Sequence, residues 1–257
     1  MNKATDNLPA LAVIIGRAGS KGLPGKNALI VAGRPMVCHT IDHARASTHV
    51  GRIVVSTDGN EIAEAARQTN VPVIDRPAEL AGDEVTVDAA VRHAVQAAGG
   101  DEPIIVILYA NVPVRPADLI DRAIATLIET GADSVQSYCD VGKHHPAWTS
   151  TVNLSTSTVT PYDPTIAIPY RRQDLPPVYE LDGGVIVVTR ESLFTVIEGE
   201  PHAFLGKDRR GIVSPRGSVI DVDERVDLLV AEATLRLQRE TASAAAAVAP
   251  APDGEGG

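Results

Sequence analysis

Apolar runs alternate along the chain with segments of helical periodicity. The continuous runs cover residues 11–16, 53–56, 104–108 and 185–188. A run without polar alternation is typical of a strand that is buried on both faces, as in a parallel sheet. Strands that alternate with helices predict an α/β fold, with a mostly parallel central sheet flanked by helices.

Two helices have clear amphipathic patterns. In residues 116–131, apolar side chains recur at helical spacing, with Pro116 in the first turn and Gly131 just past the end. Residues 224–239 repeat the signal, and Asp223 stands where it can cap the helix. We expect this last helix to close the domain through one apolar face, formed by Val226, Leu229, Val230, Ala233 and Leu237.

Two segments depart from the alternation. Residues 144–177 are rich in Pro, Thr, Ser and Tyr, which predicts an arm or lid of short strands and loops. Residues 242–257 are nearly all Ala, Pro, Gly and acidic residues, so burial cannot offset their ordering entropy. We therefore expect one domain over residues 1–241, followed by a disordered tail.

Composition narrows the class of protein. The chain has 257 residues and a net charge of −10, and this acidic balance argues against nucleic acid as a partner. Cys38 and Cys139 lack the spacing of a disulfide framework or a zinc site, so we expect free thiols. No stretch approaches transmembrane length or has the pattern of a signal peptide, which predicts a cytoplasmic protein with no membrane partner.

The segment after the first predicted strand suggests anion binding. Residues 16–27 read GRAGSKGLPGKN, with four glycines and three cationic side chains. Glycines let the main chain approach an anion, and Lys and Arg neutralise phosphate charge. The spacing matches neither the G-x-G-x-x-G fingerprint nor the Walker loop. A solvated turn with surface lysines is the alternative, but the position after a buried strand favours a different nucleotide-binding fold.

This loop and later segments resemble the acylneuraminate cytidylyltransferases, or CMP-sialic acid synthetases, and relatives that load CMP onto Kdo-like sugar acids. The family loop R-x-x-S-K-G-x-P-x-K-N is present through Arg17, Ser20, Lys21, Gly22, Pro24, Lys26 and Asn27. Further matches follow in family order at residues 55–66, 76–83, 144–146, 171–174 and 220–224. The resemblance covers most of residues 11–240.

The resemblance implies a Rossmann-like domain similar to nucleotide-diphospho-sugar transferases, in a homodimer with an exchanged arm. It implies a Mg²⁺-dependent transfer of CMP from CTP to the anomeric hydroxyl of a sugar acid, with release of pyrophosphate. Arg17, Lys21, Arg171 and Arg172 form the implied catalytic set. A loop asparagine and a strand-end arginine also have ordinary turn and surface explanations. The implied nucleotide contacts are Gly16, Arg17, Ala18, Gly19, Ser20, Lys21, Gly22, Lys26, Asn27, Arg76 and Asp83.

Three aspartates are candidate metal or capping residues. Asp221 and Asp223 lie two apart, so on a strand both carboxylates would face the same side and suit Mg²⁺. Helix capping is the alternative for Asp223. Asp58 ends a predicted strand at an edge where ligands bind, but it also precedes a helix that begins near Asn60. We expect Asp58 to cap that helix, and we place Asp221 and Asp223 in the metal site.

The acceptor would be held by residues from several segments. Arg171 and Arg172, with Gln173, could bind a carboxylate by forked hydrogen bonds or support the leaving group, whereas an exposed basic turn is the alternative. The implied acceptor contacts are Tyr109, Asn111, Arg172, Gln173, Asp182 and Gly183.

The histidines and the single tryptophan offer weaker candidates. His39 and His43 are four apart on a predicted helix but lack a third ligand for a metal. His144 and His145 sit in the arm and, through the family match, could approach the substrate of a neighbouring subunit. We expect Trp148 to anchor the arm in apolar surroundings.

The match departs from the family at the acceptor side. Residues 108–113 read LYANVP where the family has L-Q-P-T-S-P, residues 182–183 read DG in place of NG, and Glu180 replaces a basic residue of at least one sialate-using relative. We therefore expect a modified nonulosonic or octulosonic acid, such as an amino-bearing one, rather than N-acetylneuraminate. The alternatives are a nucleotidyltransferase for another sugar or sugar phosphate, and an inactive nucleotide-binding dimer.

Overall fold

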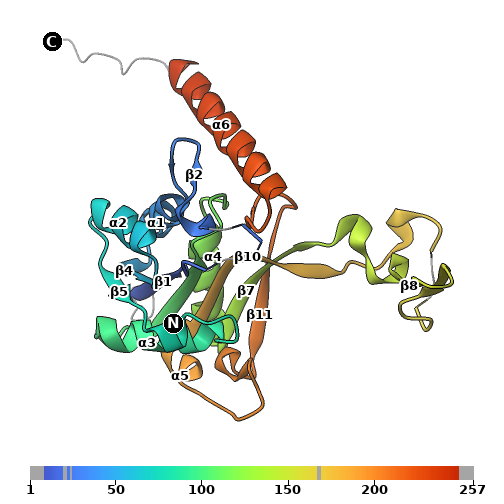
Figure 1. Ribbon diagram of the computed structural model, residues 1–257, viewed down its shortest axis with the longest axis horizontal. Coiled ribbons are helices and arrows are strands. Elements are labelled where there is room, and N and C mark those ends of the chain that lie inside the picture. The colour runs from blue at the N-terminus through green and yellow to red at the C-terminus, as the bar shows by residue number, and fades with distance from the viewer. Residues whose placement is uncertain (1–8, 20–21, 24, 167–168, 249–257) are drawn as a thin grey trace.

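A seven-stranded sheet forms the centre of the molecule and carries helices on both faces (Figure 1). The computed structural model describes residues 9–19, 22–23, 25–166 and 169–248. The strand order is β11-β7-β10-β6-β1-β4-β5. All pairings within the sheet are parallel except those of β10, which lies antiparallel between β6 and β7. The predicted α/β class is confirmed.

The four predicted apolar runs are strands of this sheet. The strands are β1 Ala10–Ile15, β4 Val50–Thr57, β5 Val73–Asp75, β6 Ile104–Tyr109, β7 Ser134–Asp140, β10 Tyr179–Thr189 and β11 Arg209–Ser214. β10 extends well beyond the run that predicted it. β7 and β11 contain Ser, Gln, Asp or Arg among their apolar residues, so no continuous run announces them.

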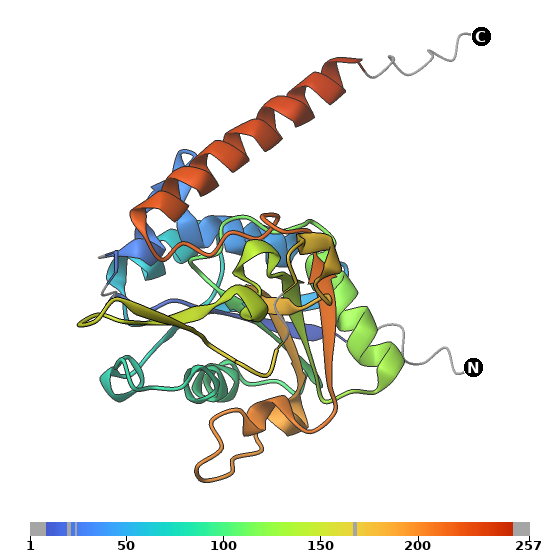
Figure 2. The ribbon, with the colours of Figure 1, turned by 90° about the vertical axis from the view of Figure 1, so that its right-hand side faces the viewer.

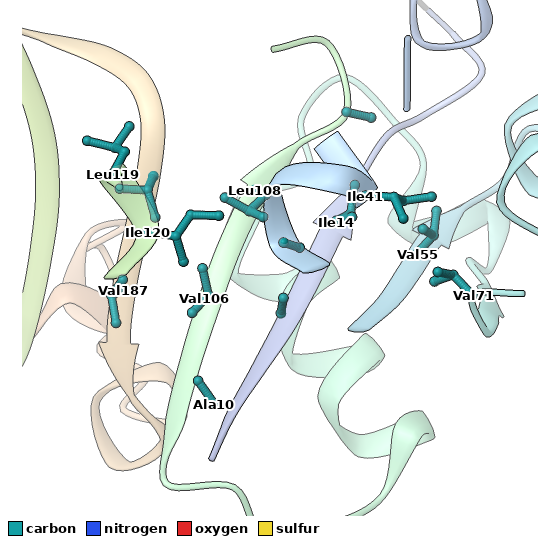
Figure 3. Packing of buried hydrophobic residues seen from close by; sticks show 14 of the residues in the cluster. Ala10, Ile14, Ile41, Val55, Val71, Val106, Leu108, Leu119, Ile120 and Val187 are labelled. Carbon is teal, nitrogen blue, oxygen red and sulfur yellow. The ribbon is translucent and has the colours of Figure 1, made fainter. Parts of the chain in front are cut away.

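Alternation along the strands divides the core into two layers. Ala10, Ala12 and Ile14 of β1 face one cluster, whereas Leu11 and Val13 face the other, because successive side chains point to opposite faces. The first cluster is covered by α1 Met36–Ala46, α2 Asn60–Gln68 and α4 Leu119–Thr130 (Figure 3). The second is covered by α3 Val87–Ala98, by the short helix α5 Arg190–Leu193 and by η6 Ala203–Leu205.

The predicted helix at residues 116–131 is α4, and its end follows the expected signal. Gly131 adopts a left-handed conformation with φ of 65°, and its N–H donates to the carbonyl of Leu127. Glycine tolerates this conformation because it has no Cβ. None of the helices in the described part of the chain combines the length and hydrophobicity that a membrane-spanning helix needs.

The last helix differs from its prediction in three respects. α6 spans Arg225–Val248, so it includes residues 242–248, which we expected to be disordered; residues 249–257 lie outside the description. Asp223 does not cap α6, since the backbone N–H groups of Asp223 and Glu224 instead donate to the Asp227 carboxylate at 3.0 and 2.8 Å.

The apolar face that we expected α6 to bury is exposed. Val226, Leu229 and Leu237 are 58%, 63% and 63% exposed. The helix packs instead through Ala231 and Leu235, with Leu228 partly buried beside them. Their partners include residues of the hairpin formed by β2 Ile30–Val31 and β3 Arg34–Pro35.

Residues between β7 and β10 project from the sheet (Figure 1). Their ordered parts are η3 Gly142–His144, η4 Pro146–Trp148, the hairpin of β8 Ser150–Asn153 with β9 Thr158–Pro161, and η5 Arg172–Asp174. His145 joins the two ends of this arm, since its Nε2 lies 3.1 Å from the Pro176 carbonyl while its Nδ1 accepts from the Ala147 N–H at 3.1 Å. Trp148 donates from Nε1 to the Pro169 carbonyl at 3.1 Å, which links two arm segments.

Substitutions in the buried sheet should lower stability far more than substitutions at the exposed periphery. Ile107 lies on the central strand β6 with 0% exposure, so Ile107→Ala should lower the free energy of unfolding by about 2–5 kcal/mol through lost burial and a cavity. Ile30, on β2, is 60% exposed and serves as the control; Ile30→Ala should change it by less than about 0.5 kcal/mol. If urea unfolding gave the same loss of stability for both variants, Ile107 would not be part of the buried core.

Candidate functional site

A cleft of about 320 Å³ opens at the carboxyl ends of the parallel strands. Ile15 and Gly16 line it where β1 ends, Tyr109 lines it at the end of β6, and Arg76 follows β5. Open α/β sheets bind ligands at this edge because the strand-to-helix loops meet there. Most of the predicted nucleotide contacts that the structure describes border this cleft.

The loop of residues 16–27 is held close to the sheet by backbone contacts. A Cβ on Gly16 would lie 2.8 Å from the Ala110 Cβ, so this position has room only for glycine. Asn27, which is buried, donates from Nδ2 to the Arg17 carbonyl at 2.9 Å and ties the two ends of the loop together. Ser20 and Lys21 fall outside the described residues.

Asp58 supports this loop and does not cap a helix. Its carboxylate accepts a hydrogen bond from the Ala18 N–H at 2.8 Å, across 40 residues of sequence. The N-cap of α2 is Gly59, which has no side chain to cap with. The capping prediction for Asp58 is therefore wrong, because the end of β4 directs the carboxylate toward the loop instead.

Cationic and acidic side chains face each other across the cleft. Arg17 pairs with Asp83, and Lys26 pairs with Asp223. The Lys26 side chain is only 18% exposed, whereas that of Asp223 is 67% exposed. The two cations come from the loop and the two acids from segments that face it, so an anionic ligand could replace the carboxylates as the partner of each cation.

Arg76 is fixed at the end of the neighbouring strand. It donates from Nε to the Ser56 Oγ at 3.2 Å and from Nη2 to the Ser56 carbonyl at 2.8 Å. Burial lowers the pKa of this guanidinium from its ordinary value. Arg76 therefore places a rigid positive charge on the wall of the cleft.

Asp221 and Asp223 line the same cleft but do not belong to a strand of the sheet. They follow an isolated bridge between Val114 and Ile220, so they do not lie on the strand on which the sequence argument placed them, although both border the cleft. Asn111 donates from Nδ2 to Asp221. Burial, reinforced by the negative charge of Asp223, raises the pKa of Asp221 to about 6.

A second cavity of about 520 Å³ adjoins the first. Tyr109 and Asp221 border both cavities. The walls of the second are largely apolar, and no Lys or Arg occurs among its described lining residues. Its lining includes Gln136, Ser137, Leu181, Gly183, Val185, Ile186, Phe204 and Leu205.

The predicted acceptor contacts fall into separate groups. Gly183 lines the second cavity and has φ of +72°, and a Cβ there would meet the Asp221 Oδ2 at 3.1 Å. Asn111 borders the first cavity. Asp182 lines neither cavity; its Oδ1 accepts from Ser137 Oγ and from the Gly184 N–H at 2.9 Å, which gives it a turn-stabilising role.

None of the described side chains of the arm lines either cavity within this chain. Arg171 donates from Nε to Asp174 at 2.9 Å, and Gln173 is exposed. Arg172 begins η5, but its side chain lies outside the description. The cations that we expected to hold the acceptor are therefore in the projecting arm (Figure 1).

Arg115 is a site-supporting residue that the sequence interpretation missed. It is 4% exposed, and its guanidinium donates to the carbonyls of Tyr109, Val112 and Gly184 and to Thr40 Oγ1. These acceptors lie at the end of β6 and in the loop after it, on α1 and on β10, so one buried cation joins three elements behind the cavities. Burial lowers its pKa to about 9. The sequence hints at this role only through the position of Arg115, a charged residue among apolar neighbours.

The histidine pair does not form a metal site. His39 places Nε2 2.9 Å from the Val31 carbonyl. Burial, together with the charge of Arg115, lowers the pKa of His43 to about 3. Among the residues that the structure describes, no three His, Cys, Asp or Glu side chains are grouped to share an ion, and both cysteines are free thiols.

Asp221 should make stability depend on pH with a defined sign. Its pKa rises from 3.8 to about 6 on folding, so a penalty appears as pH rises through this range and persists above it. Asp221 retains substantial contact with solvent, which screens part of this penalty, so Asp221→Asn should raise the free energy of unfolding above pH 7 by about 1 kcal/mol, with little change below pH 4. Urea unfolding at a series of pH values, without divalent cations, measures this. A pH-independent difference would contradict it.

Comparison with known proteins identifies relatives of this chain. Residues 11–196 match the family model described as cytidylyltransferase. The N-acylneuraminate cytidylyltransferase of Streptococcus agalactiae serotype III is 32% identical over 184 residues, which cover 71% of this chain and 44% of that protein. The chain thus aligns with less than half the length of that relative. The CMP-N,N'-diacetyllegionaminic acid synthase of Legionella pneumophila is 29% identical over 238 residues, covering 90% and 97% of the two chains.

The fold also has solved counterparts. The structure of a CMP:2-keto-3-deoxy-manno-octonic acid synthetase complexed with CTP matches with a TM-score of 0.68, covering 90% of this chain and 99% of that one. Its sequence identity is 16%, so this likeness concerns the fold alone. The match of the family model to most of the chain confirms the resemblance first seen in the loop of residues 16–27. This chain belongs to the cytidylyltransferase family.

Proposed function

We propose that this protein transfers CMP from CTP to the anomeric hydroxyl of a nonulosonic, sialic-acid-like or related sugar acid and releases pyrophosphate. The observation that carries the proposal is the arrangement of the first cleft, where Arg17 and Lys26 face Asp221 and Asp223. Cations on one wall suit a triphosphate, and acids on the other suit the metal ion that accompanies it. Family membership supports a cytidine nucleotide as the donor.

Binding of CTP would exchange the charge partners across the cleft. The triphosphate would take the place of Asp83 beside Arg17 and of Asp223 beside Lys26. Asn27 and Asp58 would keep the loop backbone in position for this exchange, since Asn27 ties the two ends of the loop together and Asp58, which follows β4, holds the Ala18 N–H. Preformed contacts of this kind lower the entropy lost on binding.

The reaction needs positioning and charge neutralisation rather than a covalent enzyme intermediate. The anomeric oxygen forms a bond to the α-phosphorus, the bond from that phosphorus to the bridging oxygen breaks, and the electron pair leaves with pyrophosphate. The hydroxyl proton passes to solvent or to a carboxylate. Arg17 and Lys26 would offset the charge of the phosphates, and Lys21 is proposed to join them from the family match.

The two aspartates fit a divalent metal. Both present carboxylate oxygens to the cleft, and oxygen ligands suit Mg²⁺. The raised pKa of Asp221 reflects burial first and the negative charge of Asp223 second, and a bound divalent cation would offset both effects. When bound, Mg²⁺ neutralises phosphate oxygens and lowers the pKa of an attacking hydroxyl.

The second cavity is the proposed acceptor site. It meets the nucleotide cleft at Tyr109 and Asp221, so an acceptor there would lie next to the α-phosphate. Its described walls are largely apolar and contain no Lys or Arg, while His202 and the carboxylates of Asp88 and Asp221 supply polar groups, which suits a sugar acid with neutral or amino substituents. In the homodimer implied by the family, exchanged arms would bring Arg171 and Arg172 to the carboxylate of the acceptor in the neighbouring subunit.

Removing one metal-binding carboxylate tests the mechanism. Asp223→Asn should lower kcat for pyrophosphate release from CTP at least ~10²-fold, because an electrostatic contact in the transition state is lost. Asp118→Asn is a matched control, since that side chain is 66% exposed and its partner in the described part of the chain is Arg122 on the adjacent turn of α4. Near-normal turnover of Asp223→Asn would remove this residue from the site.

A panel of acceptors tests the substrate class. With CTP and Mg²⁺, amino-bearing nonulosonic or octulosonic acids should give a higher kcat/KM than N-acetylneuraminate, because the stretch after β6 departs from the family pattern. Pyrophosphate release measures each rate. The highest kcat/KM with N-acetylneuraminate would contradict this choice of acceptor, and CTP binding without turnover on any acid would support an inactive binding protein instead.

A further inference from the structure

Two buried polar side chains border the second cavity and keep hydrogen-bonding capacity that the described part of the chain does not use. They are Asp88 and Gln136. Asp88 is 8% exposed and Gln136 is 9% exposed, so both are withdrawn from bulk water. Buried polar groups normally have hydrogen-bond partners, because an unpaired one costs free energy. Two such groups in a largely apolar cavity therefore point to a polar group on a ligand.

Asp88 offers one free acceptor atom. It lies in the first turn of α3, where the helix dipole favours a negative charge. Its Oδ2 accepts a hydrogen bond from Nη1 of Arg92, one turn further along the helix. Its Oδ1 is buried and has no hydrogen-bond partner among the residues that the structure describes. The helix and Arg92 thus account for the charge of Asp88, and Oδ1 is left to accept from a donor that enters the cavity.

Gln136 comes from the sheet that α3 covers. It lies on β7 opposite Ile186 of β10, so these two side chains share one face of the sheet. Ile186 belongs to the core layer beneath α3, which lies on the other side of the sheet from α1 (Figure 2). Within the described ranges, the side-chain amide of Gln136 makes no hydrogen bond. Its N–H groups are therefore available to a carbonyl in the cavity.

An acylamino group carries the complementary pair of atoms. Its N–H can donate to Oδ1 of Asp88, and its carbonyl oxygen can accept from Nε2 of Gln136. The largely apolar walls suit the acyl methyl group. A free ammonium has no acceptor for Gln136, and a hydroxyl leaves the apolar walls unfilled. The two residues and the walls together match an acylamino group better than either alternative.

We propose that Asp88 and Gln136 are specificity-determining residues that recognise an acylamino group of the acceptor. The inference rests on the proposed function, because it takes the second cavity as the acceptor site. Neither side chain lines the first cleft. Substitutions of these residues should therefore change the choice of acceptor and leave the binding of CTP unchanged.

Asp88→Asn tests the acceptor atom by reversing its polarity. The asparagine would turn its oxygen toward the Arg92 donor and its amide N–H groups toward the cavity. We compare kcat/KM for a nonulosonic acid with two acetamido groups with kcat/KM for N-acetylneuraminate, which has one. The ratio of the two should fall at least ~10-fold, because an N–H would then meet an N–H. Pyrophosphate release measures both rates, and KM for CTP should stay at its wild-type value.

Arg92→Gln is the matched control for a structural role. It breaks the same ion pair but leaves the Asp88 carboxylate on the wall of the cavity. If Asp88 acts by recognition, the ratio in Arg92→Gln should stay at its wild-type value. A fall as large as that in D88N would overturn the proposal, since Asp88 would then act only by holding α3 in place.

Gln136→Leu tests the second residue independently. Leucine fits the apolar layer, so this variant should fold even if D88N does not, and far-UV circular dichroism checks this. The ratio should fall about 3-fold or more through the loss of one hydrogen bond to the acyl carbonyl. An unchanged ratio in either folded variant would overturn the proposal. Equal kcat/KM values for the two acids in the wild type would also overturn it, while CMP transfer itself would be established.

Equilibrium binding distinguishes failure of this inference from failure of the proposed function. If the wild type released no pyrophosphate with any acid, the proposed reaction would be wrong, and calorimetry with the same two acids would decide the inference. Tighter binding of the acid with two acetamido groups, lost in D88N, would support acylamino recognition by the cavity. Equal binding of the two acids, or binding of neither, would overturn it.

Discussion

Opposed charges across one cleft are the constraint on which the rest of the site depends. Lys26 and Arg17 lie on the loop after β1, and their carboxylate partners come from segments far away in the sequence. Neither pair is deeply buried, so each contributes little to stability by itself. In the proposed reaction, these pairs would hold cations and acids close enough to exchange partners when a polyanion and a divalent ion enter together.

The fold supplies this arrangement with few elements. The ends of β1 and β6 place the loop and Tyr109 side by side, because these strands are parallel neighbours in the sheet. The bridge between Val114 and Ile220 brings Asp221 to the same edge. Arg115 then ties the loop after β6 to β10 from beneath. A buried cation bonded to neutral oxygens is costly to remove, because its loss leaves carbonyls without partners in both walls.

Local patterns predicted the buried strands and the glycine-rich loop that follows the first of them, because each depends on neighbours in the sequence. The strands β7 and β11 were not predicted, since polar residues interrupt their apolar positions. Local patterns also could not predict long-range contacts. Asp58 accepts a hydrogen bond from the Ala18 N–H, and only the sheet brings these two residues together.

α6 illustrates a different limit. Periodicity revealed an apolar face, but this helix has two, and the narrower one at Ala231 and Leu235 packs against the domain. Only the positions of neighbouring elements decide which face is buried. The same limit applies to the arm. Arg171 and Arg172 match the family pattern, but local sequence does not say which elements lie next to their side chains.

Calorimetric titration of the protein with CTP, with and without Mg²⁺, tests the central claim most directly. If the cations of the loop and the acids that face them form one nucleotide and metal site, CTP should bind with one site per chain, and Mg²⁺ should tighten that binding. The absence of CTP binding, or an affinity that Mg²⁺ leaves unchanged, would contradict the account.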